Sequence, residues 1–406
     1  MREPGGHGGR AGLPYTMVRD VARLVGCESP SEDLGAVARS AEVVAEVGAR
    51  WLGGEPERIV IDGCTHLRWR FGGEPRVLLL GHHDTVWPVG TLARRPFEVR
   101  DGVLRGPGCF DMKAGLVVAF HALAGLSGLD GVTVLVTGDE EPGSATSRGL
   151  IEDEARGCTA ALVLEAAGPG GALKTARKGV SRYEVIVPDS PGAAVELARL
   201  VVAVAGLGDA AAGTTVTPTR MEAGPGGARF EVDARVWDQA EQDRVHAAMT
   251  GLPGAEVRGG PNRPPLAGAA SRELFERASR LADRLGVGPL AEVAVGGASD
   301  GNFTAGVGTP TLDGLGAVGG GAHAEDEHVL VAELPRRARL LAALVTDLLT
   351  DARAATQPEE RAGRPSEPAS GAEPAGLAGE DRAGCSDGRT GVAGAVRVDH
   401  LQGWSG

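Results

Sequence analysis

The chain has 406 residues, which is long enough for two or more domains with a large buried core. Its formal net charge of −13 provides no positive excess to displace phosphate counterions, so the composition argues against a nucleic-acid-binding protein. The five cysteines include no CxxC pair, which argues against a disulfide framework and a cysteine-based zinc site. No apolar run approaches the ~18 residues of a membrane span, and the N-terminus lacks a signal-peptide core, so we expect a cytoplasmic protein with no membrane partner.

The first part of the chain alternates amphipathic segments with short apolar runs. We expect helices over residues 18–25, 34–52, 114–126 and 147–154. We expect strands over residues 77–80, 132–136 and 161–164. Buried strands that alternate with helices are typical of an α/β fold with a mostly parallel sheet.

A different order of elements begins near residue 174. The expected elements are a strand at 181–187, a helix at 192–205, a hairpin of 214–221 and 229–237, a helix at 240–249 and a strand at 255–258. This β-α-β-β-α-β order is typical of a ferredoxin-like domain. The α/β pattern then returns with a helix at 271–285, a strand at 309–312 and a helix at 332–349.

The first domain is therefore interrupted by the second. We place the first domain at 14–173 and 260–351, and the inserted domain at 174–259. Residues 352–406 are mainly Pro, Gly, Ala, Glu and Arg. Such a segment buries too little apolar surface to offset its chain entropy, so we expect a disordered tail.

Polar side chains follow three of the expected strands. His82 and Asp84 come after the first strand, Glu140 and Glu141 after the second, and Glu165 after the third. Open α/β sheets bind ligands beyond the carboxyl ends of their strands, so we expect these side chains to lie near one another. Each motif alone is more often an ordinary loop, but their equivalent positions argue for one site.

Two Gly-rich loops carry further residues of the same type. Asp111 lies in LRGPGCFDMKAG and His323 lies in GLGAVGGGAHAEDE. Two histidines and three carboxylates suit zinc, and one carboxylate can bridge two ions. One glutamate then remains free to act as a base.

Four segments carry a resemblance to a known family: GHHDTVWPVGTLARRPFEVRDGVLRGPGCFDMKAG, TGDEEPGSATSRGLI, GGASDGNFTA and GLGAVGGGAHAEDEHV. They resemble the glutamate carboxypeptidase, aminoacylase and succinyl-diaminopimelate desuccinylase family of two-zinc hydrolases, and the glutamate carboxypeptidase branch is nearest. The resemblance covers about residues 18–349. It implies an α/β/α catalytic domain, interrupted by a ferredoxin-like lid.

The resemblance also implies a set of site residues. His82 and Glu165 would bind one Zn²⁺, Glu141 and His323 would bind the other, and Asp111 would bridge them, with Co²⁺ or Mn²⁺ as alternatives.

The remaining two residues at the strand ends have catalytic roles by the same resemblance. Asp84 would fix the tautomer of His82. Glu140 would be the general base, which takes a proton from the metal-bridging water and gives it to the leaving amine.

Substrate-binding residues are suggested by matching segments. Arg235 and Arg263 would hold a substrate carboxylate, for which the planar guanidinium is well suited. Asp300 and Asn302 would line the pocket or brace its loop. We expect His83 to point away from the metals.

The lid departs from the family pattern. Its first loop lacks the histidine of an SHAG-like stretch, and the only lid histidine, His246, falls within an expected helix. We therefore carry two hypotheses. The first is a carboxypeptidase- or aminoacylase-type hydrolase that cleaves an amide bond of a carboxylate-bearing peptide or N-acyl amino acid, as a homodimer formed through the lid. The alternative is a metal-binding family member with weak or no catalysis.

Overall fold

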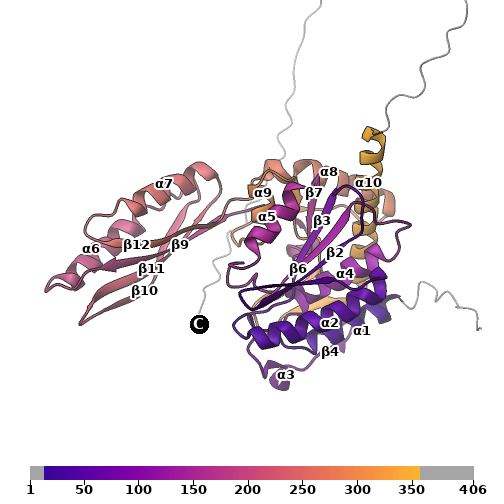
Figure 1. The fold of residues 1–406 in the computed structure, drawn as a ribbon, viewed down its shortest axis with the longest axis horizontal. Helices are drawn as coiled ribbons and strands as arrows, with labels where there is room; N and C mark the ends of the chain where they lie inside the picture. The colour runs from indigo at the N-terminus through magenta and orange to yellow at the C-terminus, as the bar shows by residue number, and fades with distance from the viewer. Residues whose placement is uncertain (1–12, 357–406) are drawn as a thin grey trace, which may run out of the picture.

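A six-stranded sheet forms the centre of the larger domain in the computed structural model, which describes residues 13–356 (Figure 1). The strand order is β1-β2-β6-β3-β7-β14. The bounds are β1 Glu57–Ile61, β2 Cys64–Arg70, β6 Val132–Thr137, β3 Val77–His82, β7 Ala160–Val163 and β14 Thr311–Leu312. β6, β3, β7 and β14 run parallel, whereas β2 is antiparallel to both β1 and β6. The predicted mostly parallel sheet is therefore confirmed.

Helices cover both faces of this sheet. One layer consists of α1 Leu13–Val25, α2 Leu34–Leu52, α4 Ala114–Leu123, α8 Gly268–Leu285 and α10 Leu334–Thr356. The other layer contains α5 Arg148–Arg156 and α9 Gly301–Gly306. Alternate residues of β3 face opposite layers, so Leu79 belongs to the core on the side of α4, while Leu78 and Leu80 belong to the core on the side of α9. This is the predicted α/β/α arrangement.

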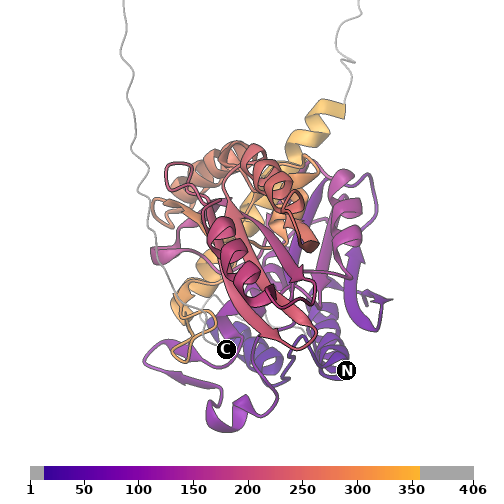
Figure 2. The same ribbon diagram turned by 90° about the vertical axis from the view of Figure 1, so that its left-hand side faces the viewer.

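The lid is a separate four-stranded sheet with two helices on one face (Figure 1). Its elements are β9 Gly179–Val187, α6 Ala193–Ala205, β10 Thr215–Gly224, β11 Gly227–Val236, α7 Gln239–Thr250 and β12 Glu256–Arg263. The strand order β10-β11-β9-β12, antiparallel throughout, is that of a ferredoxin-like domain. Its core is separate from that of the larger domain. Figure 2 shows the lid in front of the larger domain.

Two smaller sheets complete the larger domain. β8 Leu173–Arg177 pairs in parallel with β13 Glu292–Val295. The other sheet has the order β15-β16-β5-β4, formed by Gly319–Gly320, His328–Leu330, Val103–Arg105 and Glu98–Arg100. The short helices are α3 Thr91–Arg94, η1 Cys109–Lys113, η2 Pro169–Gly171 and η3 Val331–Glu333. Within residues 13–356, no helix combines the length and apolar character that crossing a bilayer requires.

The predicted domain boundaries stay predictions. β8 crosses the predicted boundary at residue 174, and β12 continues past the one at residue 259. α10 continues to Thr356, beyond the expected start of the tail, and the rest of the predicted tail lies outside the described residues.

Asn302 contacts both segments that connect the larger domain to the lid. Its Nδ2 donates to the backbone oxygens of Lys178 at 3.1 Å and Pro264 at 2.7 Å. Its Oδ1 accepts a hydrogen bond from the Ser299 N–H at 2.9 Å. Asn302 is fully buried, so its amide braces the base of the lid, one of the two roles expected for it.

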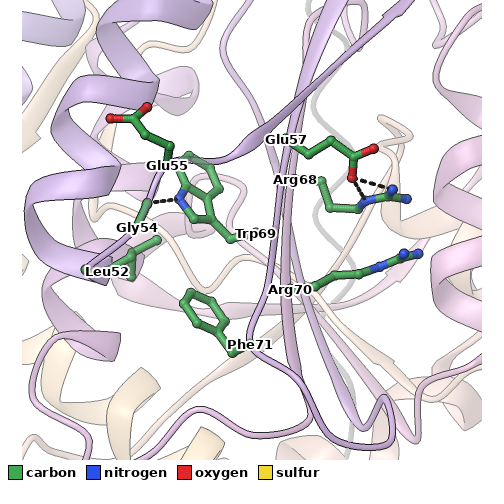
Figure 3. A pocket seen from close by; sticks show the side chains of 9 residues that line it. Leu52, Gly54, Glu55, Glu57, Arg68, Trp69, Arg70 and Phe71 are labelled. Carbon is green, nitrogen blue, oxygen red and sulfur yellow. Dashed lines mark hydrogen bonds and ion pairs between the residues drawn. The ribbon is translucent and has the colours of Figure 1, made fainter.

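A pocket of about 360 Å³ lies between the end of α2 and strand β2 (Figure 3). Trp69 and Phe71 lie on one side of β2, whereas Arg68 and Arg70 lie on the other. The Trp69 indole donates to Gly54 O, and Arg68 pairs with Glu57. None of the predicted ligands lines this pocket.

Candidate metal centre

The structure brings together the five predicted ligands from five separate segments. His82 ends β3, Glu141 and Glu165 follow β6 and β7, Asp111 lies in η1, and His323 lies in the loop between β15 and β16. His82 Nε2 lies 3.4 Å from Asp111 Oδ1 and 3.5 Å from Glu165 Oε1. His323 Nε2 lies 3.1 Å from Asp111 Oδ2 and 3.2 Å from Glu141 Oε2. Asp111 therefore presents one carboxylate oxygen to each histidine.

The chemistry of this donor set fits divalent cations. His82 Nε2 is buried without a hydrogen-bond partner, although it faces the carboxylates of Asp111 and Glu165. The ligand atoms of His82, Asp111 and Glu141 lie within 4.8 Å of one another, as do those of His82, Glu140 and Glu165. Imidazole nitrogen and carboxylate oxygen are common zinc ligands. Metal ions bound here would give His82 Nε2 a partner and would offset the negative charge of the neighbouring carboxylates.

The electrostatics of the metal-free centre point the same way. Burial raises the pKa of Glu141 to about 7, and burial also raises the pKa of Glu140 well above its usual range. Hydrogen bonds to Asp111 and Glu141 raise the pKa of His323 to about 11. Without metal, the cluster therefore holds protons to offset its negative charge.

Asp84 connects His82 to the loop that carries the glutamates. His82 Nδ1 lies 3.1 Å from the Asp84 backbone oxygen and 3.3 Å from its Oδ1. The Asp84 carboxylate accepts hydrogen bonds from the N–H groups of Glu140 at 3.1 Å and Glu141 at 3.2 Å, and from Ser31 Oγ at 2.6 Å. The contact between His82 Nδ1 and Asp84 directs Nε2 of His82 toward the cluster. The bonds to the backbone of the glutamates were not predicted from the sequence.

Arg263 brings the end of the lid against Glu140. Its Nη2 lies 2.9 Å from Glu140 Oε1, 3.1 Å from Asp300 Oδ1 and 2.8 Å from Ser144 Oγ. Asp300 also accepts hydrogen bonds from Thr137 Oγ1 and Ser144 Oγ. Asp300 thus braces Arg263, and Arg263 holds one oxygen of Glu140.

Arg235 lies on the lid strand β11, outside this network. Its Nε donates to Asp233 Oδ1 at 2.8 Å, and its Nη1 donates to Gly296 O at 3.2 Å. Substrate binding by Arg235 or Arg263 stays a prediction.

Three other histidines in the described part of the chain have partners away from the proposed ligands. His83 Nε2 lies 3.1 Å from Thr65 O, and His328 Nδ1 lies 2.8 Å from Asp326 O. His246 packs on the Tyr183 ring in the lid.

Arg177 is a residue of this centre that sequence reasoning missed. It is buried, and its Nη2 lies 3.5 Å from Glu165 Oε2, while its Nε donates to Asp313 Oδ2 at 2.6 Å. A signal existed in the sequence, because the period-two pattern of β8 places Arg177 on the same buried face as Leu173. Asp313 fixes the Arg177 guanidinium, which lies beside Oε2 of Glu165, while Oε1 of Glu165 faces His82.

The comparisons with known proteins agree with this geometry. The model of peptidase family M20/M25/M40 matches residues 78–347, a stretch that contains all five predicted ligands. The chain belongs to this family. Carboxypeptidase G2 of Pseudomonas sp. (strain RS-16), a similar protein, is 30% identical over 312 residues, which cover 68% of this chain and 74% of that protein.

Solved structures of the M20 family share the fold. The M20 family metallo-carboxypeptidase Sso-CP2 from Sulfolobus solfataricus superposes with a TM-score of 0.64 at 15% identity, covering 82% of this chain and 98% of the other. The YXEP protein of Bacillus subtilis, described as a dinuclear metal-binding peptidase of the M20 family, has a TM-score of 0.59 at 15% identity and covers 84% of this chain and 99% of its own.

Proposed function

We propose that this M20 family protein is a two-metal hydrolase that cleaves an amide bond in a carboxylate-bearing peptide or N-acyl amino acid. The observation that carries the proposal is the position of Asp111, whose two oxygens face two histidines, with the buried Glu140 in the same cluster. The similarity to carboxypeptidase G2 favours a carboxypeptidase-like activity over the aminoacylase type.

We propose Zn²⁺ as the metal, and the same donors accept Co²⁺ or Mn²⁺. His82 and Glu165 would hold one ion, Glu141 and His323 would hold the other, and Asp111 would contact both. When bound, the ions would polarise the substrate carbonyl and make water more acidic.

The chain's own residues account for the proton transfers. Glu140 would accept a proton from the attacking water and return it to the nitrogen of the leaving amine. Glu140 is buried, and the Arg263 guanidinium fixes the direction of its carboxylate. Asp84 keeps the His82 ring oriented.

The second candidate is a metal-binding protein with weak or no catalysis. The lid favours it, because only five residues separate the end of β9 at Val187 from the start of α6 at Ala193. His246 lies on α7 and contacts Tyr183, with Nδ1 3.3 Å from the tyrosine hydroxyl. The lid therefore lacks a histidine to stabilise the oxyanion, a donor typically worth about 10²–10³ in rate.

A comparison of variants on a substrate panel separates the two candidates. The metal-loaded full chain is assayed against dipeptides and N-acyl amino acids, beside Glu140→Gln. We expect Glu140→Gln to keep its metal and to lose about 10²–10⁴ in turnover, the usual contribution of a positioned general base. Glu276→Gln, an exposed change on α8, is the matched control.

Two outcomes would change the assignment. Near-native turnover by metal-loaded Glu140→Gln would show that Glu140 is not the base. Native protein that holds two metals but hydrolyses no member of the panel would favour the second candidate.

We also propose a homodimer formed through the lid and a cytoplasmic location. β10 is an edge strand with Met221 exposed, so its backbone is available for pairing with a second copy. Light scattering of the native protein and of Met221→Lys tests the dimer, since the lysine would disfavour strand pairing.

A further inference from the structure

Glu327 has a fully buried carboxylate beside the metal centre, although it is not one of the predicted ligands. Its Oε1 accepts hydrogen bonds from the N–H groups of Phe110 at 2.8 Å and Asp111 at 3.1 Å. Its Oε2 accepts hydrogen bonds from the Gly108 N–H at 2.8 Å and from Trp87 Nε1 at 2.9 Å. Both oxygens are therefore fully engaged, and all four donors are N–H groups.

These four hydrogen bonds join three segments that carry metal ligands. Trp87 lies in the loop after His82, the three backbone donors surround Asp111, and Glu327 itself follows the turn that contains His323. The Glu327 N–H donates back to this turn, to Ala324 O at 3.1 Å. One side chain thus fixes the relative positions of both histidine loops and of the carboxylate between them.

A second contact reinforces the same junction. The Arg95 guanidinium lies over the Trp87 ring at 4.4 Å from the ring centroid. The same guanidinium donates from Nη2 to Ala324 O at 3.3 Å. The loop after His82 is therefore attached to the His323 turn at two points, of which only the Glu327 carboxylate also reaches Asp111.

The backbone around Asp111 needs such an acceptor. Asp111 has φ −114° and ψ 97°, so η1 does not continue as a regular helix there. N–H groups that leave a helical ladder in a buried position are costly unless another group accepts their hydrogen bonds. The Glu327 carboxylate supplies these acceptors and so determines the direction in which Asp111 points.

We propose that Glu327 is a positioning residue of the metal centre, which holds Asp111 between His82 and His323 and thereby sets the affinity for metal. The inference rests on the proposed function, since it takes Asp111 as a ligand. Residues that orient ligands in this way typically contribute about 10–100-fold to metal affinity.

A glutamine substitution tests this role with little change in volume. Glu327→Gln retains one acceptor oxygen but places an NH₂ donor against two of the N–H groups. We expect the affinity for Co²⁺ to fall by about 10–100-fold and the visible absorption band of bound Co²⁺ to change. Glu325→Gln is the matched control, because it makes the same chemical change at an exposed position of the same turn.

The measurement is a Co²⁺ titration of the metal-free full chain, followed by absorbance and calorimetry. Circular dichroism of each metal-free variant reports folding separately. Trp87→Phe is the second variant, because it removes one donor and leaves the backbone donors paired; we expect a smaller loss of Co²⁺ affinity. This variant decides the question if Glu327→Gln does not fold.

The outcomes distinguish this inference from the proposed function. Co²⁺ binding that is weakened in Glu327→Gln and Trp87→Phe but not in Glu325→Gln would support the inference. If Glu327→Gln folds and binds Co²⁺ as tightly as the native protein, only this inference is overturned. If Glu327→Gln does not fold, unchanged Co²⁺ affinity in Trp87→Phe overturns it in the same way. Native protein that binds no Co²⁺ would overturn the proposed function and this inference with it.

Discussion

The two halves of the proposed metal centre are built in different ways. The inner half consists of His82 and Glu165, which follow adjacent parallel strands in the middle of the sheet. Their side chains are 2% and 9% exposed. The outer half consists of Glu141, whose side chain is as buried as that of Glu165 at 8% exposed, and His323. His323 is 37% exposed and lies in a turn, with a φ of 61°.

The difference lies in what holds each ligand. The inner ligands take their positions from buried strands, whereas the outer histidine depends on a loop that Glu327 and Arg95 fasten to its neighbours. Buried strands open only with the whole domain, but loops with fewer apolar contacts open locally. We therefore expect the inner half to bind metal more tightly and to release it more slowly.

The largest effect is expected at Asp111, which belongs to both halves. Asp111→Asn removes a negative charge from each, so we expect affinity for both ions to fall by more than the about 100-fold typical of residues that only orient ligands. Elemental analysis after dialysis should show clearly fewer than two equivalents. Asp101→Asn, at an exposed turn, is the control. Two tightly retained equivalents in Asp111→Asn would contradict the bridging role.

Substituting the two histidines one at a time tests whether the two halves differ in metal retention. We expect His323→Gln to keep one metal equivalent that resists a chelator, because the inner half is intact. We expect His82→Gln to keep at most one equivalent, which the same chelator removes readily. Chelator competition with each metal-loaded variant measures this. The opposite order of release would show that burial does not rank the two halves.

Arg177 tests the inner half alone. Arg177→Gln removes the cation beside Glu165 and leaves Asp313 without its charged donor. We expect about a 10–100-fold loss of affinity for the inner ion, with the outer ion unaffected. Arg272→Gln, exposed on α8, is the control. An equal loss of affinity for both ions would show that the substitution perturbs the fold as a whole and does not act on the inner half alone.

The smallest effect concerns protons. In the metal-free protein, hydrogen bonds to Asp111 and Glu141 raise the pKa of His323 to about 11, so its imidazole is protonated near neutral pH. A metal needs the neutral imidazole, so binding at the outer half must release this proton. Affinity should then rise about tenfold per pH unit for each proton released. Calorimetry in buffers of different ionisation enthalpy measures the release, and a heat independent of buffer would contradict it.

The sequence by itself predicted the α/β/α plan and the ferredoxin-like insertion, which the structure confirms, and it also supplied the five proposed ligands. These features rest on local patterns, because apolar runs mark buried strands and the ligands follow the ends of those strands or lie in Gly-rich loops. The edge strand β1 and its neighbour β2 were not predicted. β1 is short and largely exposed, and its apolar run is limited to Ile59, Val60 and Ile61, which is too short to mark a strand by itself.

Only the tertiary structure decided the partners of the ligands. Arg263 is 123 residues from Glu140, and Glu327 is 216 residues from Asp111. No local pattern connects residues at such separations, because their contact depends on the order of strands in the sheet and on where the lid rejoins the domain. The sequence therefore supplied the proposed ligands, and the packing of distant segments determined which side chains hold them in place.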